Sequence, residues 1–151
     1  MRENVLHKKL FTKIYRKARY RSFTNRIFET KQMARHNKIG AMAENLATDY
    51  LLRKGYKILD RNWRFSTAEV DLIGMDGEIL VFVEVKSLGY DTFKRPEASV
   101  TYYKQGLIMD AASQYMENIG HEWEIRFDVI SMILNEGELV ELVHFKDAFF
   151  E

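Results

Sequence analysis

Two acidic residues and a lysine lie close together on two apolar segments that are typical of buried β-strands. Asp71 belongs to the first segment, and Glu84 and Lys86 belong to the second, two residues apart. Because side chains alternate across a strand, residues two apart project from the same face. Mg²⁺ prefers carboxylate oxygens as ligands, and a nearby lysine can orient a water molecule or offset phosphate charge. The pattern therefore predicts a site for Mg²⁺, with Mn²⁺ as a substitute, that acts on a phosphodiester.

The dipeptide Asp76-Gly77 separates the two apolar segments and predicts a hairpin with a two-residue turn. In that register Met75 pairs with Glu78, and Asp71 consequently faces Phe82. One face of the hairpin then carries Glu69, Asp71, Phe82, Glu84 and Lys86. The other face carries Val70, Leu72, Val81, Val83 and Val85.

In this arrangement Asp71 and Glu84 are diagonal neighbours, about 7 to 8 Å apart along the backbone, from which two carboxylates can share a cation. An unpaired charge at the end of an apolar central strand costs several kcal/mol, whereas a paired or metal-bound charge need not. A divalent ion is one explanation for these charges. A salt-bridge cluster of Asp71, Glu84 and Lys86 without a metal is the structural alternative.

Three further acidic residues have both a chemical and a structural interpretation. Glu44 lies at the edge of a predicted buried helix stripe, so it could either join the site or remain exposed. Glu69 is expected at an exposed edge position rather than as a ligand. Asp128 is expected to form an ion pair with Arg126 or Arg61, a structural role.

Basic and aromatic residues near the second predicted helix could contact nucleic acid. Lys104 could touch a phosphate or remain in solvent. Trp63, Tyr102 and Tyr103 could stack on bases, although aromatic residues in a domain of this size more often belong to the core. The four histidines show no ligand spacing, so no imidazole metal site is expected.

The elements that position these residues follow from hydrophobic periodicity and turn signals. We expect helices over residues 40–54 and 98–118, ending near Gly55 and Gly120, and strands over residues 56–65, 68–74, 78–87, 123–134 and 139–145. This order, one helix, three strands, one helix and two strands, predicts an α/β fold with a central mixed sheet flanked by helices. The third strand is apolar on both faces up to Val83, as expected for a strand covered on both sides.

Composition places the chain among ordinary globular proteins. The 151 residues are 46% hydrophobic and 30% charged, which suits one domain with an appendage. The absence of cysteine excludes disulfides and thiolate zinc sites. The longest apolar run, residues 79–83, is far shorter than the roughly 18 residues of a membrane-spanning helix. We therefore expect a cytoplasmic protein without a membrane span.

Charge divides the sequence at residue 38. Residues 1–38 carry twelve basic and two acidic residues, a net charge of +10, whereas residues 39–151 carry eleven basic and twenty acidic residues, a net charge of −9. We therefore expect a basic N-terminal extension, residues 1–38, joined to a globular domain, residues 39–151.

The extension has the pattern of a basic amphipathic helix. Leu6, Leu10, Ile14 and Ala18 recur every four residues, and the basic residues among them include Lys13, Arg16, Lys17 and Arg19. Such a helix could lie along phosphates, on an anionic membrane or against another protein. A dispensable extension, with translation starting at Met33 or Met42, is a further alternative.

These residues resemble a known family. Asp71 followed by Glu84-Val85-Lys86 resembles the PD-(D/E)xK nuclease signature, with Val70 in place of the leading proline. Residues 40–149 are similar to the small bacterial YraN-type family UPF0102, whose members are described as endonuclease-like and similar to archaeal Holliday junction resolvases. The matching residues are Gly40, Glu44, Ala47, Gly55-Tyr56, Arg61-Asn62-Trp63, Glu69-Val70-Asp71-Leu72, residues 81–86, Lys104, Arg126-Phe127-Asp128-Val129 and Ala148-Phe149.

The resemblance implies a restriction-endonuclease-like fold and a set of site residues. By that resemblance Asp71 and Glu84 are metal ligands, the Val85 carbonyl is a possible third ligand, and Lys86 is the catalytic lysine. Glu44 matches the first-helix glutamate that joins such sites in resolvase-like proteins. Two departures are Ala68, where a glycine is usual, and Ser87-Leu88, where a basic residue commonly follows the lysine.

Two functions remain open at this point. The first is a Mg²⁺-dependent nuclease that hydrolyses DNA, including branched or junction DNA, with Lys104 and the basic extension supplying phosphate affinity. The second is a catalytically silent nucleic-acid-binding or assembly module on the same fold. A homodimer would present two sites to two strands, and the extension could instead dock on another protein.

Overall fold

The computed structural model describes residues 29–30, 32–89 and 100–149. The chain divides into two compact units, Met1–Lys38 and Ile39–Glu151, and each is described by itself. In the first unit the described residues are helical and exposed. Among the described residues, no helix is long and apolar enough to cross a membrane.

Four basic residues proposed to bind nucleic acid, Lys13, Arg16, Lys17 and Arg19, lie outside the described residues. Their role, and that of the extension as a whole, therefore stays a prediction. The second unit carries the predicted metal ligands Asp71 and Glu84.

The second unit follows the predicted order of elements. It begins with helical residues 39–53. There follow β1 (Lys57–Phe65), β2 (Ala68–Asp76), β3 (Ile79–Gly89), α2 (Tyr102–Ile119), β4 (Ile125–Asn135) and β5 (Glu138–Phe145). The α/β class and the order of one helix, three strands, one helix and two strands are thus confirmed.

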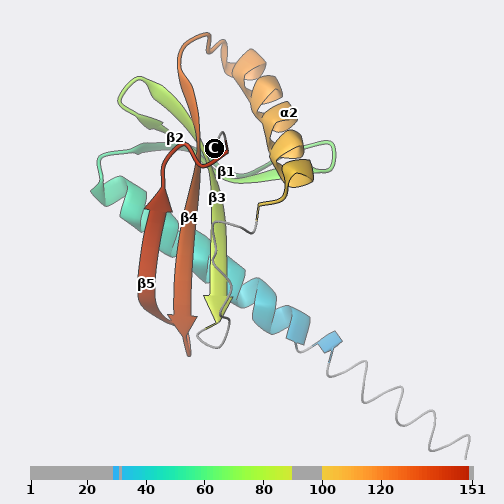
Figure 1. The fold of residues 1–151 in the computed structure, drawn as a ribbon, viewed down its shortest axis with the longest axis vertical. Coiled ribbons are helices and arrows are strands. Elements are labelled where there is room, and N and C mark those ends of the chain that lie inside the picture. Colours follow the sequence, from blue (N-terminus) through green and yellow to red (C-terminus); the bar gives the residue numbers. More distant parts are fainter. Residues whose placement is uncertain (1–28, 31, 90–99, 150–151) are drawn as a thin grey trace, which may run out of the picture. The chain divides into compact units, whose positions relative to one another are not determined.

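The five strands form one mixed sheet in the order β1-β2-β3-β4-β5 (Figure 1). Strands β3 and β4 run parallel, and the other neighbouring pairs run antiparallel. Helix α2 connects the two parallel strands, as a parallel pair requires a crossover. Strand β3 lies in the centre of the sheet, and its residues 80–83 are paired with strands on both sides.

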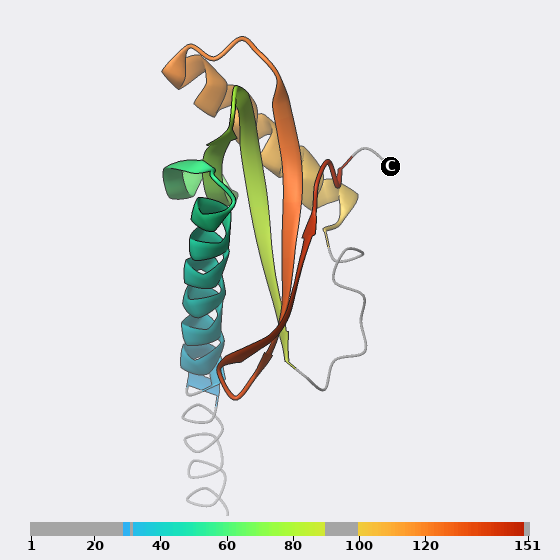
Figure 2. The same ribbon diagram turned by 90° about the vertical axis from the view of Figure 1, so that its left-hand side faces the viewer.

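Helices cover both faces of this sheet. Figure 2 shows helical residues 39–53 on one face and α2 on the other. The core under residues 39–53 contains Ala43, Ala47, Leu51, Leu72, Val81, Val83, Ile130 and Met132. The core under α2 contains Val70, Ile73, Leu80, Phe82, Ile108, Ala111, Phe127 and Val129. The two clusters share the strands, which explains why β3 is apolar on both faces up to Val83.

Helix α2 begins at a side-chain cap rather than at the expected residue 98. The backbone N–H of Lys104 donates to the Thr101 hydroxyl oxygen at 3.2 Å, which satisfies one N–H of the first helical turn. The helix ends at Gly120, whose φ of +65° lies in the left-handed region that glycine adopts without steric cost. The cap places Tyr102, Tyr103 and Lys104 in the first turn.

The predicted hairpin register between β2 and β3 is wrong by two residues. Asp76 pairs with Ile79, so the turn consists of Gly77 and Glu78. Asp76 remains in the strand because its Oδ2 lies 2.9 Å from Arg126 Nη2 and 3.1 Å from Lys146 Nζ. Gly77, with a φ of +64°, suits the first position of such a turn.

The corrected register changes the partner of Asp71. Phe82 pairs with Ile73, and the last β2–β3 pair in the structure is Leu72 with Val83. Extended by one residue, this register places Asp71 level with Glu84 rather than with Phe82. A shift of two residues keeps each side chain on its face, so the prediction that these carboxylates lie near each other survives the error.

Beyond Leu72 and Val83 the strands β2 and β3 separate, each keeping its other partner. Strand β2 stays paired with β1 as far as Ala68, and β3 stays paired with β4 as far as Gly89. Val70 packs in the cluster of Phe82, which corrects the prediction that these residues occupy opposite faces. We attribute this to the separation of β2 from β3, because side chains of two strands share one face of a sheet only where the strands are paired. We call this point the strand fork.

Candidate metal centre at the strand fork

The carboxylate of Asp71 bridges the strand fork. Its Oδ2 accepts a hydrogen bond from the backbone N–H of Val85 at 2.7 Å. The side chain thus reaches β3 directly at a point where no β2–β3 backbone pair is present. This bond fixes the position of the carboxylate on the β2 side of the fork. It places the amide of Val85 at the site, and the ligand role of the Val85 carbonyl stays a prediction.

Glu84 is buried next to Val85, and its two oxygens have different surroundings. Its side chain is only 2% exposed. Oε1 lies 2.6 Å from Lys86 Nζ and also accepts a hydrogen bond from Lys104 Nζ. Oε2 is buried and has no hydrogen-bond partner among the described residues. A buried carboxylate oxygen without a partner is costly, and a bound cation would remove that cost.

The charges at the fork act on one another. Burial and the negative charge of Glu84 raise the pKa of Asp71 to about 7, against the lowering effect of the Val85 hydrogen bond. Burial lowers the pKa of Lys104, but its hydrogen bond to Glu84 and the charges of Glu84 and Asp71 outweigh burial and raise it. The raised pKa of Asp71 thus reflects its burial close to Glu84, and Lys86 and Lys104 offset the charge of Glu84 at the same place.

The structure brings together three predicted site residues and adds a fourth contact. Asp71, Glu84 and Lys86 meet at the fork, as predicted. Lys104 was expected to contact phosphate or solvent, but its ammonium group pairs with Glu84. The sequence signal for this placement is the Thr101 cap, which sets the start of α2 and thereby the position of Lys104.

Glu44 lies at the periphery of the fork. Its Oε2 accepts a hydrogen bond from Asn62 Nδ2 at 3.0 Å in an exposed position. Its charge contributes the smallest of the effects that raise the pKa of Asp71. Within the described residues, no group of three or more His, Asp or Glu side chains could hold a metal ion together. The candidate ligands at the fork are the carboxylates of Asp71 and Glu84, and a role for Glu44 stays a prediction.

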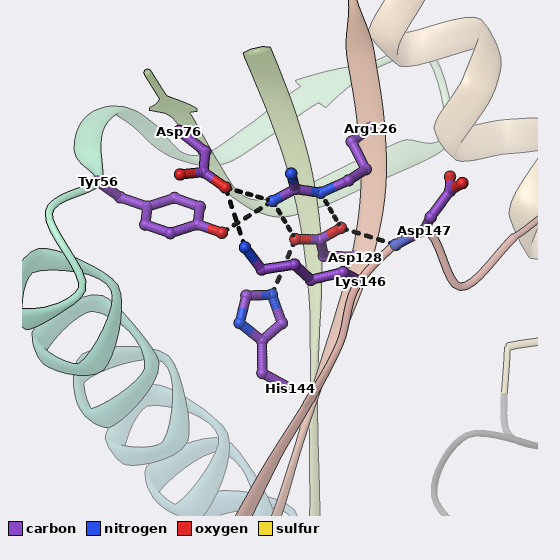
Figure 3. Close-up of polar contacts among 7 residues, drawn as sticks. All are labelled: Tyr56, Asp76, Arg126, Asp128, His144, Lys146 and Asp147. Carbon is purple, nitrogen blue, oxygen red and sulfur yellow. Dashed lines mark hydrogen bonds and ion pairs between the residues drawn. The ribbon is translucent and has the colours of Figure 1, made fainter. Parts of the chain in front are cut away.

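A second polar cluster, around Asp128, serves as a comparison (Figure 3). Asp128 is fully buried, and its Oδ1 accepts hydrogen bonds from Arg126 Nε at 2.8 Å and from the Asp147 backbone N–H at 3.0 Å. Its Oδ2 lies 3.0 Å from Arg126 Nη2 and 2.8 Å from His144 Nε2. Both oxygens thus have two partners, and the predicted structural pair with Arg126 is confirmed.

The Asp128 cluster connects distant parts of the second unit. Arg126 Nη2 also donates to the Tyr56 hydroxyl at 2.8 Å and pairs with Asp76. Burial raises the pKa of Asp128, but the hydrogen bonds from His144, Arg126 and the Asp147 N–H outweigh it and hold that pKa below its ordinary value. Arg61, the other predicted partner, instead donates to Asn45. Both oxygens of Asp128 thus have partners, whereas Glu84 Oε2 at the fork has none among the described residues.

Some of the remaining predicted residues lie at the surface, and others pack against the core. Glu69 is half-buried rather than at the expected exposed edge, and it forms an ion pair with the exposed Arg64 at 2.9 Å. Trp63 packs edge-on against Tyr115, in agreement with a core role. Tyr102 and Tyr103 are 87% and 76% exposed, so the expectation that they belong to the core is wrong.

Fold and site define the class of this protein as an α/β protein with an acidic pair and two lysines at a strand fork. The model of "Uncharacterised protein family UPF0102" matches residues 43–132, which contain this site. The chain is 41% identical to a UPF0102 protein of Rhodococcus jostii over 121 residues, covering 78% of this chain and 100% of the relative. It is 42% identical to a UPF0102 protein of Thermodesulfovibrio yellowstonii over 113 residues, covering 75% and 96%. The protein belongs to the UPF0102 family, as the resemblance predicted.

Proposed function

We propose that this protein is a divalent-metal-dependent nuclease that hydrolyses phosphodiester bonds in DNA. The observation that carries the proposal is the buried, unpartnered Oε2 of Glu84 beside Asp71, with two lysines on the other Glu84 oxygen. A structural salt-bridge cluster would satisfy both carboxylate oxygens, as the Asp128 cluster does.

The donor set fits Mg²⁺ or Mn²⁺. Asp71 and Glu84 would hold the ion, because Mg²⁺ is commonly bound by one or two carboxylates together with water and substrate phosphate. When bound, such an ion offsets charge on the phosphodiester and makes water a better nucleophile at neutral pH. Two carboxylates leave room for water and phosphate oxygen, so the absence of a third acidic ligand among the described residues suits this class of ion.

The two lysines have separate roles in this proposal. Lys86 is 26% exposed, so its ammonium group can turn from Glu84 toward substrate, where it orients the attacking water and offsets phosphate charge. Lys104 holds Glu84 from the α2 side and thereby keeps this carboxylate in place for the ion. In the reaction the water oxygen bonds to phosphorus, one P–O ester bond breaks, and the leaving oxygen takes up a proton.

Charge distribution suggests how DNA is held. The domain, residues 39–151, has a net charge of −9 and is unsuited to bind a polyanion by general attraction. The extension, residues 1–38, has a net charge of +10 and supplies affinity that does not depend on sequence. Branched and junction DNA are the substrate forms that the family resemblance suggests.

The test is a cleavage assay with the full-length protein and labelled linear, flapped and four-way DNA in Mg²⁺ or Mn²⁺. We expect cleavage that chelation with EDTA stops and that Lys86→Ala lowers by at least about 10²-fold. Glu78→Ala is the matched control, because Glu78 is an exposed carboxylate in the turn of the same hairpin, away from the fork. Cleavage that persists unchanged in Lys86→Ala would assign the activity to a contaminant.

The alternative is a catalytically silent nucleic-acid-binding or assembly module. It predicts DNA binding without cleavage of any substrate in the panel and without a Mn²⁺ binding heat that depends on Asp71. Calorimetric titration with Mn²⁺ therefore separates the two proposals before a substrate is known.

A further inference from the structure

A hollow of about 380 Å³ adjoins the metal centre on the α2 side. It lies between the start of β2 and the first two turns of α2. Its lining consists of Thr67, Ala68, Glu69, Asp71, Tyr103, Lys104, Leu107 and Ile108. Asp71 and Lys104 belong to both the hollow and the fork, so a group bound in the hollow lies directly beside the proposed metal centre.

Tyr103 forms one wall of the hollow and is not part of the hydrophobic core. Tyr103 is 76% exposed, and neither its ring nor that of Tyr102 contacts another aromatic ring of the described residues. Large exposed aromatic side chains are typical of binding surfaces. Tyr102 is still more exposed, at 87%, but does not line the hollow. The neighbouring tyrosines thus differ in whether they face this space.

The charge of the lining selects against a phosphate group. Lys104 is the single basic residue of the lining, and its ammonium group is paired with Glu84. Glu69 is paired with Arg64, and Asp71 accepts the Val85 N–H, so the lining presents no unpaired positive charge to an anion. Apolar side chains of Ala68, Leu107 and Ile108 complete the lining. A flat, uncharged ring with polar edges suits these surroundings better than a sugar-phosphate backbone does.

We infer that this hollow binds one unpaired nucleobase of the substrate, stacked on Tyr103, next to the phosphodiester at the fork. The inference rests on the proposed function and deepens it by naming the substrate class. A base inside a duplex has both faces covered by its neighbours, so only an unpaired or extruded base can enter such a space. The favoured substrate at the cleavage position is therefore a strand with unpaired nucleotides, because extruding a base from a continuous duplex costs unstacking and unpairing energy.

The test measures binding without hydrolysis, using the full-length protein in Ca²⁺ and fluorescence anisotropy. The probes are a labelled 20-base-pair duplex, the same duplex with a four-nucleotide unpaired bulge, and that bulge with abasic sites in place of its bases. We expect Tyr103→Ala to weaken binding of the intact bulge about 5- to 100-fold and to leave binding of the abasic bulge unchanged. Tyr103→Phe keeps the ring and should retain the affinity for the intact bulge.

Tyr102→Ala is the matched control, because it removes an adjacent and more exposed tyrosine that does not line the hollow. It should bind all three probes as the unaltered protein does. The inference is overturned if Tyr103→Ala weakens the intact and abasic bulges equally, if it weakens neither, or if Tyr102→Ala has the same effect. A thermal midpoint that both alanine variants retain confirms that folding is intact.

The same measurements distinguish this inference from the proposed function. Binding that depends on Tyr103, without cleavage in Mg²⁺ or Mn²⁺, would support the base site and refute the nuclease. Metal-dependent cleavage of continuous duplex that Tyr103→Ala leaves unchanged would support the nuclease and refute the base site.

Discussion

The carboxylate of Asp71 and the backbone N–H of Val85 are joined by a 2.7 Å hydrogen bond across the fork between β2 and β3. This bond occupies the place where a strand-to-strand backbone pair would otherwise continue. Glu84 precedes Val85 and is held by Lys86 and Lys104 through one oxygen. Both candidate metal ligands are therefore positioned by the protein before any ion binds, which is the condition for a precise site.

Substitution of Asp71 should abolish metal binding. We expect Asp71→Ala to weaken Mn²⁺ binding by roughly 100-fold or more, because only one of two carboxylate ligands remains. Isothermal titration calorimetry of full-length protein measures the effect. Glu69→Ala, two residues away on β2, should retain the binding heat because Glu69 pairs with Arg64. An unchanged heat in Asp71→Ala would exclude Asp71 as a ligand.

The metal-free fork should destabilise the fold above neutral pH. The pKa of Asp71 rises from 3.8 to about 7 through burial and the charge of Glu84. The unfolded chain therefore ionises at a lower pH, so the stability contributed by protonated Asp71 is fully present below about pH 4 and lost as the pH rises through about 7.

Asp71→Asn, which keeps an oxygen for the Val85 N–H, should remove this loss. In EDTA its free energy of unfolding should exceed that of the unaltered protein by roughly 1–3 kcal/mol at pH 8, with the difference disappearing toward pH 4. Urea denaturation between pH 4 and pH 8 provides the measurement. A difference that does not vary with pH would show that the charge of Asp71 is not the cause.

The Asp128 cluster should contribute strongly to stability. Asp128→Ala leaves Arg126 and His144, with side chains 13% and 6% exposed, without their shared partner. We expect a loss of about 3 kcal/mol in the free energy of unfolding. Asp147→Asn is the control, because Asp147 contributes its backbone N–H to the cluster and asparagine tolerates its φ of +56°. Equal losses in both variants would contradict this assignment.

A side chain at position 74 should destabilise the fold, because the neighbouring backbone of β1 leaves no room for it. A Cβ at this position would lie 2.9 Å from the backbone oxygen of Lys57, so β1 and β2 would have to move apart. We expect Gly74→Ala to lower the free energy of unfolding by about 1–3 kcal/mol. Gly106→Ala, in α2 with open space around it, should instead raise it by about 0.5–1 kcal/mol. Denaturant unfolding of both variants tests the pair, and a stable Gly74→Ala would contradict it.

The basic extension should determine how strongly DNA binding depends on salt. Changing Lys13, Arg16, Lys17 and Arg19 to glutamine removes four positive charges. If these residues contact phosphates, the slope of log affinity against log salt should become less steep by up to about 3 to 4. Anisotropy titrations with the duplex between 50 and 200 mM salt measure this slope. An unchanged slope and affinity would favour docking of the extension on another protein.

Several features of the fold could be predicted because their signals are local in the sequence. Hydrophobic periodicity indicated both helices of the second unit, and Gly120 marked the end of α2. Alternation along the strands placed Glu84 and Lys86 on one face, and a two-residue error in the register did not change that face. The sequence did not predict which residues form the turn between β2 and β3. Asp76 is held in β2 by Arg126 and Lys146, which lie far along the chain.

The amino-acid sequence alone thus determined the α/β order and the acid, acid and lysine set at residues 71, 84 and 86. Only the tertiary structure decided that β2 and β3 part at Leu72, that Lys104 pairs with Glu84, and that Tyr103 lines a hollow beside Asp71. Residue type and periodicity act over a few neighbouring residues, and the sequence therefore carries them directly. The burial of Glu84 Oε2 without a partner depends on how α2 and three strands pack together, which no local pattern encodes.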